Sequence, residues 1–205
     1  AQGAGTITRR ALTVDTVAAQ SKTYDGTTAA DTSKFHATLG NLVAGEENLV
    51  TATATGAAYN DKNVAAANKV SYTGLALTGT GAGNYTLDKT ALTGIGTIAR
   101  RALTLGAVAA QTKTYDGNTL ADASKFHAAL NNVVSGEEDL VKATATGATY
   151  NDKNVAGAST IDYTGVALSG AEAGNYTLAA TTAQGAGTIS RRALTVDTVA
   201  AQSKT

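Results

Sequence analysis

The 205-residue sequence contains no cysteine, proline, methionine or tryptophan, and only 5% of its residues are aromatic. Without cysteine the chain can form no disulfide, no thiolate metal site and no cysteine nucleophile. The low aromatic content, together with abundant alanine, threonine and glycine, favours a β-rich protein with thin cores over an enzyme with a deep apolar pocket.

Charge and hydropathy argue against two further classes of partner. The 16 basic and 16 acidic side chains give a net charge of zero. Proteins that bind phosphate backbones cluster their lysines and arginines, and this chain shows no such cluster. No apolar run is long enough to span a bilayer, and no signal peptide is visible. We therefore expect no nucleic-acid partner and no membrane insertion.

A tandem repeat is the main feature of the sequence. Residues 9–99 and 100–190 are identical at 61 of 91 positions. A unit of 91 residues is large enough to form its own core, unlike solenoid repeats of about 20 to 50 residues. We therefore expect two tandem 91-residue domains in an elongated array.

The two ends of the chain look like parts of further repeats. Residues 1–23 match residues 183–205 at 22 of 23 positions. We assign residues 1–8 to the closing strand of a preceding repeat and residues 191–205 to the opening strand of a following one. No Gly/Ser-rich or Pro-rich linker separates the repeats, so we expect them to be stiffly coupled.

Alternation of small apolar residues with threonine predicts a mostly β fold. The segment "NLVTATATGAAY", residues 48–59, has the period of two that is typical of a half-buried strand. In "TITRRALTV", Ile7 and Leu12 lie five residues apart and would face opposite sides of a straight strand. We expect the isoleucine to close one core and the leucine to open the next. The four tyrosines of each repeat are the expected core anchors.

The segment "DTSKFHATLGNLV", residues 31–43, fits two structures. In its second copy Phe126 and Leu130 have helical spacing, whereas Phe35 and Leu39 also fit one face of a strand. We favour a short helix, because alanine replaces threonine at two positions of the second copy and alanine favours helix. A hairpin, a helix and further strands then give an α+β, β-grasp-like order with one short helix per domain.

The motif "KTYDG" occurs once in each repeat. Asp-Gly is a turn dipeptide, in which aspartate accepts backbone hydrogen bonds and glycine adopts a positive φ. No second catalytic group recurs beside it, so we interpret it as a structural turn rather than a ligand site. The turn residues are Tyr24, Asp25, Gly26, Tyr115, Asp116 and Gly117.

Two other motifs carry candidate sites. "YNDKNV" places Asp61 and Asn63, and in the second copy Asp152 and Asn154, one residue apart, which is half of a calcium-loop pattern. Lysine stands between them and no bidentate glutamate follows, so an exposed hairpin turn is the alternative.

"NYT" is an N-x-T sequon at Asn84 and Asn175, which makes both asparagines glycosylation candidates. His36 and His127 are the only histidines, and they stand at equivalent positions without metal-ligand spacing. No nucleophile–base pair is visible either. We expect no catalytic residue, no cofactor and no enzymatic activity.

The combination of "KTYDG", a mid-repeat "GEE", "YNDKNV", "YTGLALTG", "AGNYTL" and "TITRRALT" resembles the YDG and mostly-β-grasp (MBG) repeats of large bacterial surface adhesins. These adhesins are of the filamentous haemagglutinin and high-molecular-weight type, and the resemblance covers essentially the whole chain. In such repeats a proline often follows Thr-Ile-x. Here Arg9, Arg100 and Arg191 stand at that place.

The resemblance implies a stalk or spacer in a secreted or surface-anchored, outer-membrane-associated adhesin that functions in cell adhesion or biofilm formation. Many adhesins of this type are exported by two-partner secretion. It implies a monomer whose partners are the neighbouring repeats, with host or matrix glycans recognised through other regions. The alternative is a glycan- or calcium-binding module within the adhesin. No catalytic residue is carried over.

Overall fold

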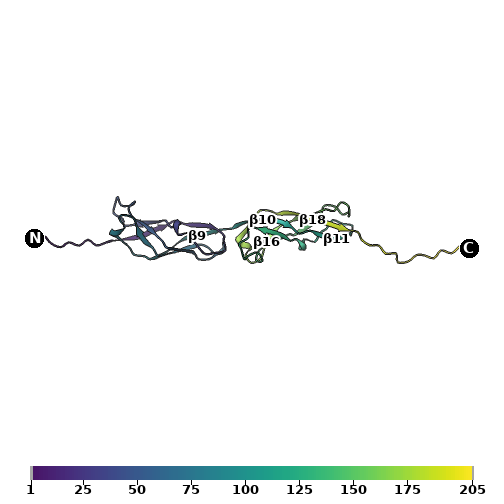
Figure 1. Cartoon of the computed structure of the whole chain (residues 1–205), viewed down its shortest axis with the longest axis horizontal. Coiled ribbons are helices and arrows are strands. Elements are labelled where there is room, and N and C mark those ends of the chain that lie inside the picture. The colour runs from purple at the N-terminus through teal and green to yellow at the C-terminus, as the bar shows by residue number, and fades with distance from the viewer. Residues whose placement is uncertain (1, 205) are drawn as a thin grey trace. The chain divides into compact units, whose positions relative to one another are not determined.

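The computed structural model describes residues 2–204 and divides the chain into two compact units. The first unit comprises the chain through Arg101 together with Gly174–Tyr176, and the second comprises Ala102–Ala173 and the chain from Thr177 onward. Both units are mostly β (Figure 1). Residues 2–204 form no α-helix, and no helix among them could cross a membrane.

The first repeat contains nine short strands and two single 3₁₀ turns. The strands are β1 (Arg10–Val17), β2 (Gln20–Thr23), β3 (Ala37–Gly40), β4 (Thr51–Thr53), β5 (Gly56–Tyr59), β6 (Lys69–Thr73), β7 (Ala76–Thr78), β8 (Tyr85–Leu87) and β9 (Ala91–Ala99). The 3₁₀ turns are η1 (Thr32–Lys34) and η2 (Ala82–Asn84).

The second repeat has the same element order. Its strands are β10 (Arg101–Val108), β11 (Gln111–Thr114), β12 (Ala128–Asn131), β13 (Lys142–Thr144), β14 (Gly147–Tyr150), β15 (Thr160–Thr164), β16 (Ala167–Ser169), β17 (Tyr176–Leu178) and β18 (Thr182–Ser190). Its 3₁₀ turns are η3 (Ala123–Lys125) and η4 (Ala173–Asn175). In Figure 1, β18 runs beside β11, with which it pairs in parallel.

Each set of strands forms two main sheets and a two-stranded ribbon. In the first repeat the sheets have the orders β3-β1-β8 and β2-β9-β6-β5, and the ribbon is β4-β7. The second repeat has β12-β10-β17, β11-β18-β15-β14 and β13-β16. Because only two residues separate β1 from β2, this stretch of chain contributes to both sheets in turn.

The predicted strand over residues 48–59 divides into two strands that join different sheets. Ala52, in β4, is buried and pairs with β7, whereas Tyr59, in β5, is buried and pairs with β6. The buried positions are therefore even-numbered in β4 and odd-numbered in β5. Because a single straight strand keeps one parity, the change of parity shows where the chain changes sheet.

The expected helix over residues 31–43 does not form. The Asp31 carboxylate accepts hydrogen bonds from the Ser33 backbone nitrogen (2.9 Å) and hydroxyl (2.7 Å), which closes one 3₁₀ turn. Phe35 is then extended and buried, and β3 pairs antiparallel with β1. The alternative strand interpretation is therefore the correct one, because pairing with a neighbouring strand outweighs the few tenths of a kcal/mol by which alanine favours helix.

Aromatic rings anchor the core of each repeat. Phe35 packs on Tyr72 with ring centroids 4.8 Å apart, and Phe126 packs on Tyr163 in the same way at 4.7 Å. Tyr72 and Tyr163 are fully buried. Seven of the eight tyrosines are at most 4% exposed, and Tyr115 is the exception.

The joining segment places its two apolar residues as their odd spacing predicts. Ile98, in β9, is buried in the first unit, and Leu103, in β10, is buried in the second. The equivalent residues near the ends of the chain differ, since Ile7 and Leu194 are exposed. The stretches 2–9 and 191–204 contain no strand.

Candidate functional site

The lysine of the KTYDG motif is the centre of the motif's structure. Lys22 lies in β2, and its Nζ donates hydrogen bonds to the Asp25 Oδ1 (2.7 Å), the Thr27 carbonyl (2.8 Å) and the Ala29 carbonyl (2.9 Å). The ammonium group also lies 5.3 Å from the centroid of the Tyr59 ring. The three N–H donors of the ammonium thus serve these three acceptors and the Thr27 hydroxyl oxygen at 3.2 Å, and the ring covers the remaining side.

The second repeat builds the same arrangement with a different sequence around it. The Lys113 Nζ bonds to the Asp116 Oδ1 (2.8 Å) and to the carbonyls of Asn118 and Leu120 (2.9 Å each), and it lies 5.3 Å from the Tyr150 ring centroid. The side chains of Lys22 and Lys113 are only 15% and 16% exposed. The lysine therefore closes the loop that follows its strand.

The aspartate and glycine shape the turn itself. The Asp25 Oδ1 accepts a hydrogen bond from the Thr27 backbone nitrogen (3.0 Å). Gly26 has a φ of 77° and Gly117 a φ of 84°, a left-handed conformation that other residues adopt only with strain. The turn therefore needs glycine at this position for its backbone conformation.

The same contacts set the charge of the two aspartates. Burial raises the pKa of Asp25, but hydrogen bonds from the Lys22 ammonium and from Thr27 outweigh it, so the pKa lies below the ordinary value. The hydrogen bond from Lys113, helped by the Asn118 backbone, likewise lowers the pKa of Asp116. Both carboxylates are therefore held ionised as partners of their lysines.

The tyrosines of the two motif copies differ in exposure. Tyr24 is fully buried, and within the first compact unit its ring meets the Tyr176 ring edge-on at 5.4 Å between centroids. Tyr115 is 36% exposed, so it is not the core anchor that the sequence predicts.

Comparison with known proteins also finds two copies in tandem. The YDG domain model matches residues 8–92 and 99–183, which together make up most of the chain. The chain belongs to the YDG domain family. No curated protein and no solved structure matches it. The two matches confirm the tandem organisation and the resemblance that the motifs indicate.

Within these YDG domains, the calcium candidates close small turns of their own. The Asp61 Oδ1 accepts a hydrogen bond from the Asn63 backbone nitrogen (2.7 Å), and Asp152 and Asn154 repeat this at 2.7 Å. Residues 2–204 contain no group of three or more His, Cys, Asp or Glu side chains placed to hold a metal ion. Calcium binding at these four residues stays a prediction.

The two sequons of the YDG domains lie in different environments. Asn84 is exposed at the end of η2. Asn175 is 5% exposed, and within the first compact unit its Nδ2 donates to the Asn63 Oδ1 (2.9 Å) while its Oδ1 accepts from the Val64 nitrogen (2.9 Å). An enzyme that attaches a sugar needs access to Nδ2, so Asn84 is the better candidate.

The mid-repeat glutamates also serve the fold. The Tyr85 hydroxyl donates to the Glu46 carboxylate and accepts a hydrogen bond from the Val43 nitrogen (3.2 Å). The hydrogen bond to Glu46 raises the pKa of Tyr85. The Glu47 carboxylate accepts from the Gly45 nitrogen at 3.0 Å. Sequence reasoning used GEE only as part of a resemblance, because its partner tyrosine lies about 40 residues away.

Lys22 and Lys113 are the residues that sequence reasoning missed. The motif was interpreted through its Tyr-Asp-Gly part, yet the lysine makes most of its contacts. The available signal was the invariant lysine at the start of both copies, three residues before the aspartate. Both histidines, His36 and His127, are exposed beside their buried phenylalanines.

Proposed function

We propose that the two YDG domains are structural stalk repeats of a secreted or surface-anchored bacterial adhesin, which project a binding region for cell adhesion or biofilm formation. The proposal is based on the contacts that the repeated polar residues make within their own domains. In both domains the KTYDG lysine and aspartate are engaged with the domain's own backbone and with each other. Repetition of the motif therefore serves the repeated fold.

A second observation concerns the extent of the first compact unit. The compact units and the sequence repeats differ in one segment. Gly174–Tyr176 belongs to the second repeat by sequence but to the first compact unit by its contacts. There the Arg100 Nε donates to the Gly174 carbonyl (3.0 Å), and Tyr176 packs on Tyr24. These contacts lie within the first compact unit. In this proposal the partners of each repeat are the neighbouring repeats of the same chain.

The composition suits an exported protein. A chain without cysteine cannot form incorrect disulfides in an oxidising compartment. We place the protein outside the cell or on its outer surface, exported by two-partner secretion. In this proposal the chain acts as a monomeric spacer, and recognition of host or matrix glycans belongs to other regions of the adhesin.

Small-angle X-ray scattering of the chain in solution tests the stalk proposal. We expect an elongated monomer with a narrow cross-section. A chain of residues 9–99 is the control, and it should have the same cross-section and about half the length. A compact globule, or a cross-section that grows with the number of repeats, would contradict a stalk.

A further inference from the structure

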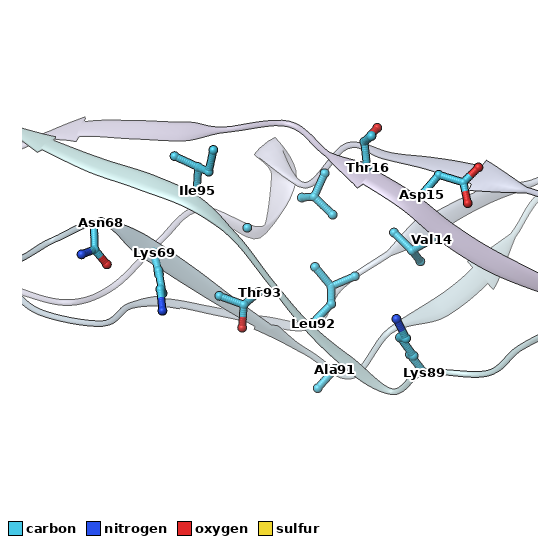
Figure 2. A pocket seen from close by; sticks show the side chains of 12 residues that line it. Val14, Asp15, Thr16, Asn68, Lys69, Lys89, Ala91, Leu92, Thr93 and Ile95 are labelled. Atoms are coloured by element: carbon cyan, nitrogen blue, oxygen red, sulfur yellow. The ribbon is translucent and has the colours of Figure 1, made fainter.

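A groove in the first repeat lies between two strands that diverge. The stretch β1–β2 runs alongside β9, and β2 pairs with it in parallel from Gln20–Gly96 to Thr23–Ala99. Upstream of this ladder, β1 pairs with β3 instead and β9 pairs with β6. A groove of about 680 Å³ opens there, lined by residues 14–17, 68–69, 89 and 91–95 (Figure 2).

Both strands present an unpaired backbone edge at this groove. Among residues 2–204, β9 has a strand partner only on the β6 side over Ala91–Ile95, and β1 has one only on the β3 side over Thr13–Val17. An unpaired edge offers a row of N–H and C=O groups to an added strand. Five residues of free edge extend for about 17 Å and can pair with a short extended peptide.

The side chains around the groove differ on its two faces. Figure 2 shows Val14 and Leu92 between the two ribbons, with Ile95 farther along β9. Val14 and Leu92 are partly buried, whereas Ile95 is 64% exposed and pairs across the strands with Lys69. In a strand added to the edge of β9, successive side chains would point to opposite faces. One set would lie toward the apolar side chains of Val14 and Leu92, and the other toward the outer face, which carries Lys69.

The charges favour an acidic occupant. Lys69 and Lys89 are exposed, and neither side chain forms an ion pair or hydrogen bond with any residue in 2–204. The groove's single carboxylate, Asp15, accepts a hydrogen bond from the Thr13 hydroxyl (2.9 Å). Two lysines without partners against one aspartate leave the groove with a positive charge.

The second repeat is a natural comparison. Over the whole repeat, 30 of 91 positions differ, but 10 of the 12 positions that line the groove differ. At the equivalent positions of the second repeat, Thr160 and Ala180 stand in place of Lys69 and Lys89. Ala183 and Ala186 stand in place of the large apolar residues Leu92 and Ile95.

The two lining positions that both repeats share hold the strands together. Val17 lies against the backbone of Gly94, where a Cβ would come within 3.2 Å of the Val17 side chain. The divergence between the repeats thus concentrates on the surface of the groove and spares the contact that shapes it.

We propose that the groove of the first repeat binds an extended peptide segment with alternating acidic and apolar side chains, by strand addition to the free edge of β9. The apolar side chains would lie toward Leu92 and Val14, and the acidic ones toward Lys69 and Lys89. This site is independent of the stalk function. If the groove bound no peptide, the scattering expected of a stalk would not change. If the scattering contradicted a stalk, the groove could still bind the peptide.

The test uses the whole chain, labelled with ¹⁵N, and an acetylated, amidated peptide of sequence Glu-Val-Glu-Val-Glu-Val-Glu. We expect saturable chemical-shift changes at residues 14–17 and 91–95 and none at the equivalent residues 105–108 and 182–186. Lys69→Thr with Lys89→Ala should weaken binding about three- to tenfold, since each exposed ion pair contributes modestly. Lys34→Ala with Lys125→Ala removes the same charge elsewhere and should leave the affinity unchanged.

Two further probes separate strand addition from other modes of binding. The same peptide with every backbone amide N-methylated keeps its side-chain charge but cannot donate ladder hydrogen bonds from either edge, so it should not bind. An oligogalacturonate carries the acidic groups on a sugar backbone and should not bind either. Three results would each overturn the proposal. They are binding of the methylated peptide, binding of the oligogalacturonate without binding of the Glu-Val peptide, and unchanged chemical shifts at residues 91–95 on addition of the Glu-Val peptide.

Discussion

Replacing Lys22 by methionine should destabilise the first repeat through a single group. Methionine keeps most of the apolar stem and removes the ammonium that bonds to Asp25 and to two loop carbonyls. The Asp25 side chain is 47% exposed and can bind water, so the ion pair contributes only about 0–1 kcal/mol. Each ammonium–carbonyl bond contributes about 1–1.5 kcal/mol. We therefore expect a loss of about 2–4 kcal/mol in the free energy of unfolding.

Such a loss is a large fraction of a domain's stability, which is typically about 5–15 kcal/mol. Native-state hydrogen exchange measures it separately in the two repeats, because buried β-strand amides exchange only through opening of their own unit. Protection should fall at Val70 and Tyr72 in β6 and stay constant at Ile161 and Tyr163 in β15. Lys113→Met should reverse this pattern.

The control for this prediction is Lys34→Met, which alters an exposed lysine at the end of η1. Surface substitutions of this kind usually change stability by less than about 0.5 kcal/mol. If Lys22→Met changes the protection of β6 no more than Lys34→Met does, the lysine is not the centre of the motif. The structural interpretation of KTYDG would then be wrong.

Four other outcomes follow from the structure. Gly26→Val should lower the melting temperature of the first repeat and cost about 1–3 kcal/mol in its free energy of unfolding, because valine resists a φ of 77°. Gly3→Val in the exposed N-terminal stretch is the control. Equal melting temperatures for the two variants would contradict a turn glycine. Because the pKa of Asp25 is lowered by folding, its stabilising contribution is complete above its unfolded pKa of about 3.9 and is lost as the pH falls through the folded value. Asp25→Asn should therefore flatten the acid limb of the stability profile, measured by urea unfolding between pH 2 and 6, and an unchanged limb would count against the ion pair. Calcium or EDTA should leave the melting temperature unchanged in calorimetry, whereas a rise with calcium would favour the calcium-binding alternative at Asp61 and Asn63. Mass spectrometry of the protein from its natural producer should find any sugar on Asn84 and none on Asn175, and a sugar on Asn175 alone would show that its buried amide becomes accessible.

Sequence reasoning was most successful where the signal was local or repeated. The offset of 91 residues predicted two tandem domains, and the two YDG matches confirm them. Threonine–alanine alternation predicted strands, which the structure contains at Thr51–Thr53 and Gly56–Tyr59. It did not predict the change of sheet between them, because alternation says which residues share a face and not which sheet the face covers.

The expected helix at residues 31–43 was wrong for a related reason. Helical spacing and alanine content describe what the segment prefers when isolated. The structure selects strand β3 because an edge of β1 is available to pair with it from Thr13 to Val17. Intrinsic preferences of a few tenths of a kcal/mol decide little against a ladder of backbone hydrogen bonds.

By itself the sequence determined the tandem organisation, the β-rich class, the glycine turn in each KTYDG motif and the family. These follow from residue composition, a fixed offset and local backbone conformation, which depend on near neighbours. Only the tertiary structure decided that Lys22 closes its loop under the Tyr59 ring, that Tyr85 meets Glu46, and that β1 and β9 diverge to open a groove. The reason is physical: each of these features joins residues about 40 to 80 positions apart, and strand pairing sets which of them meet.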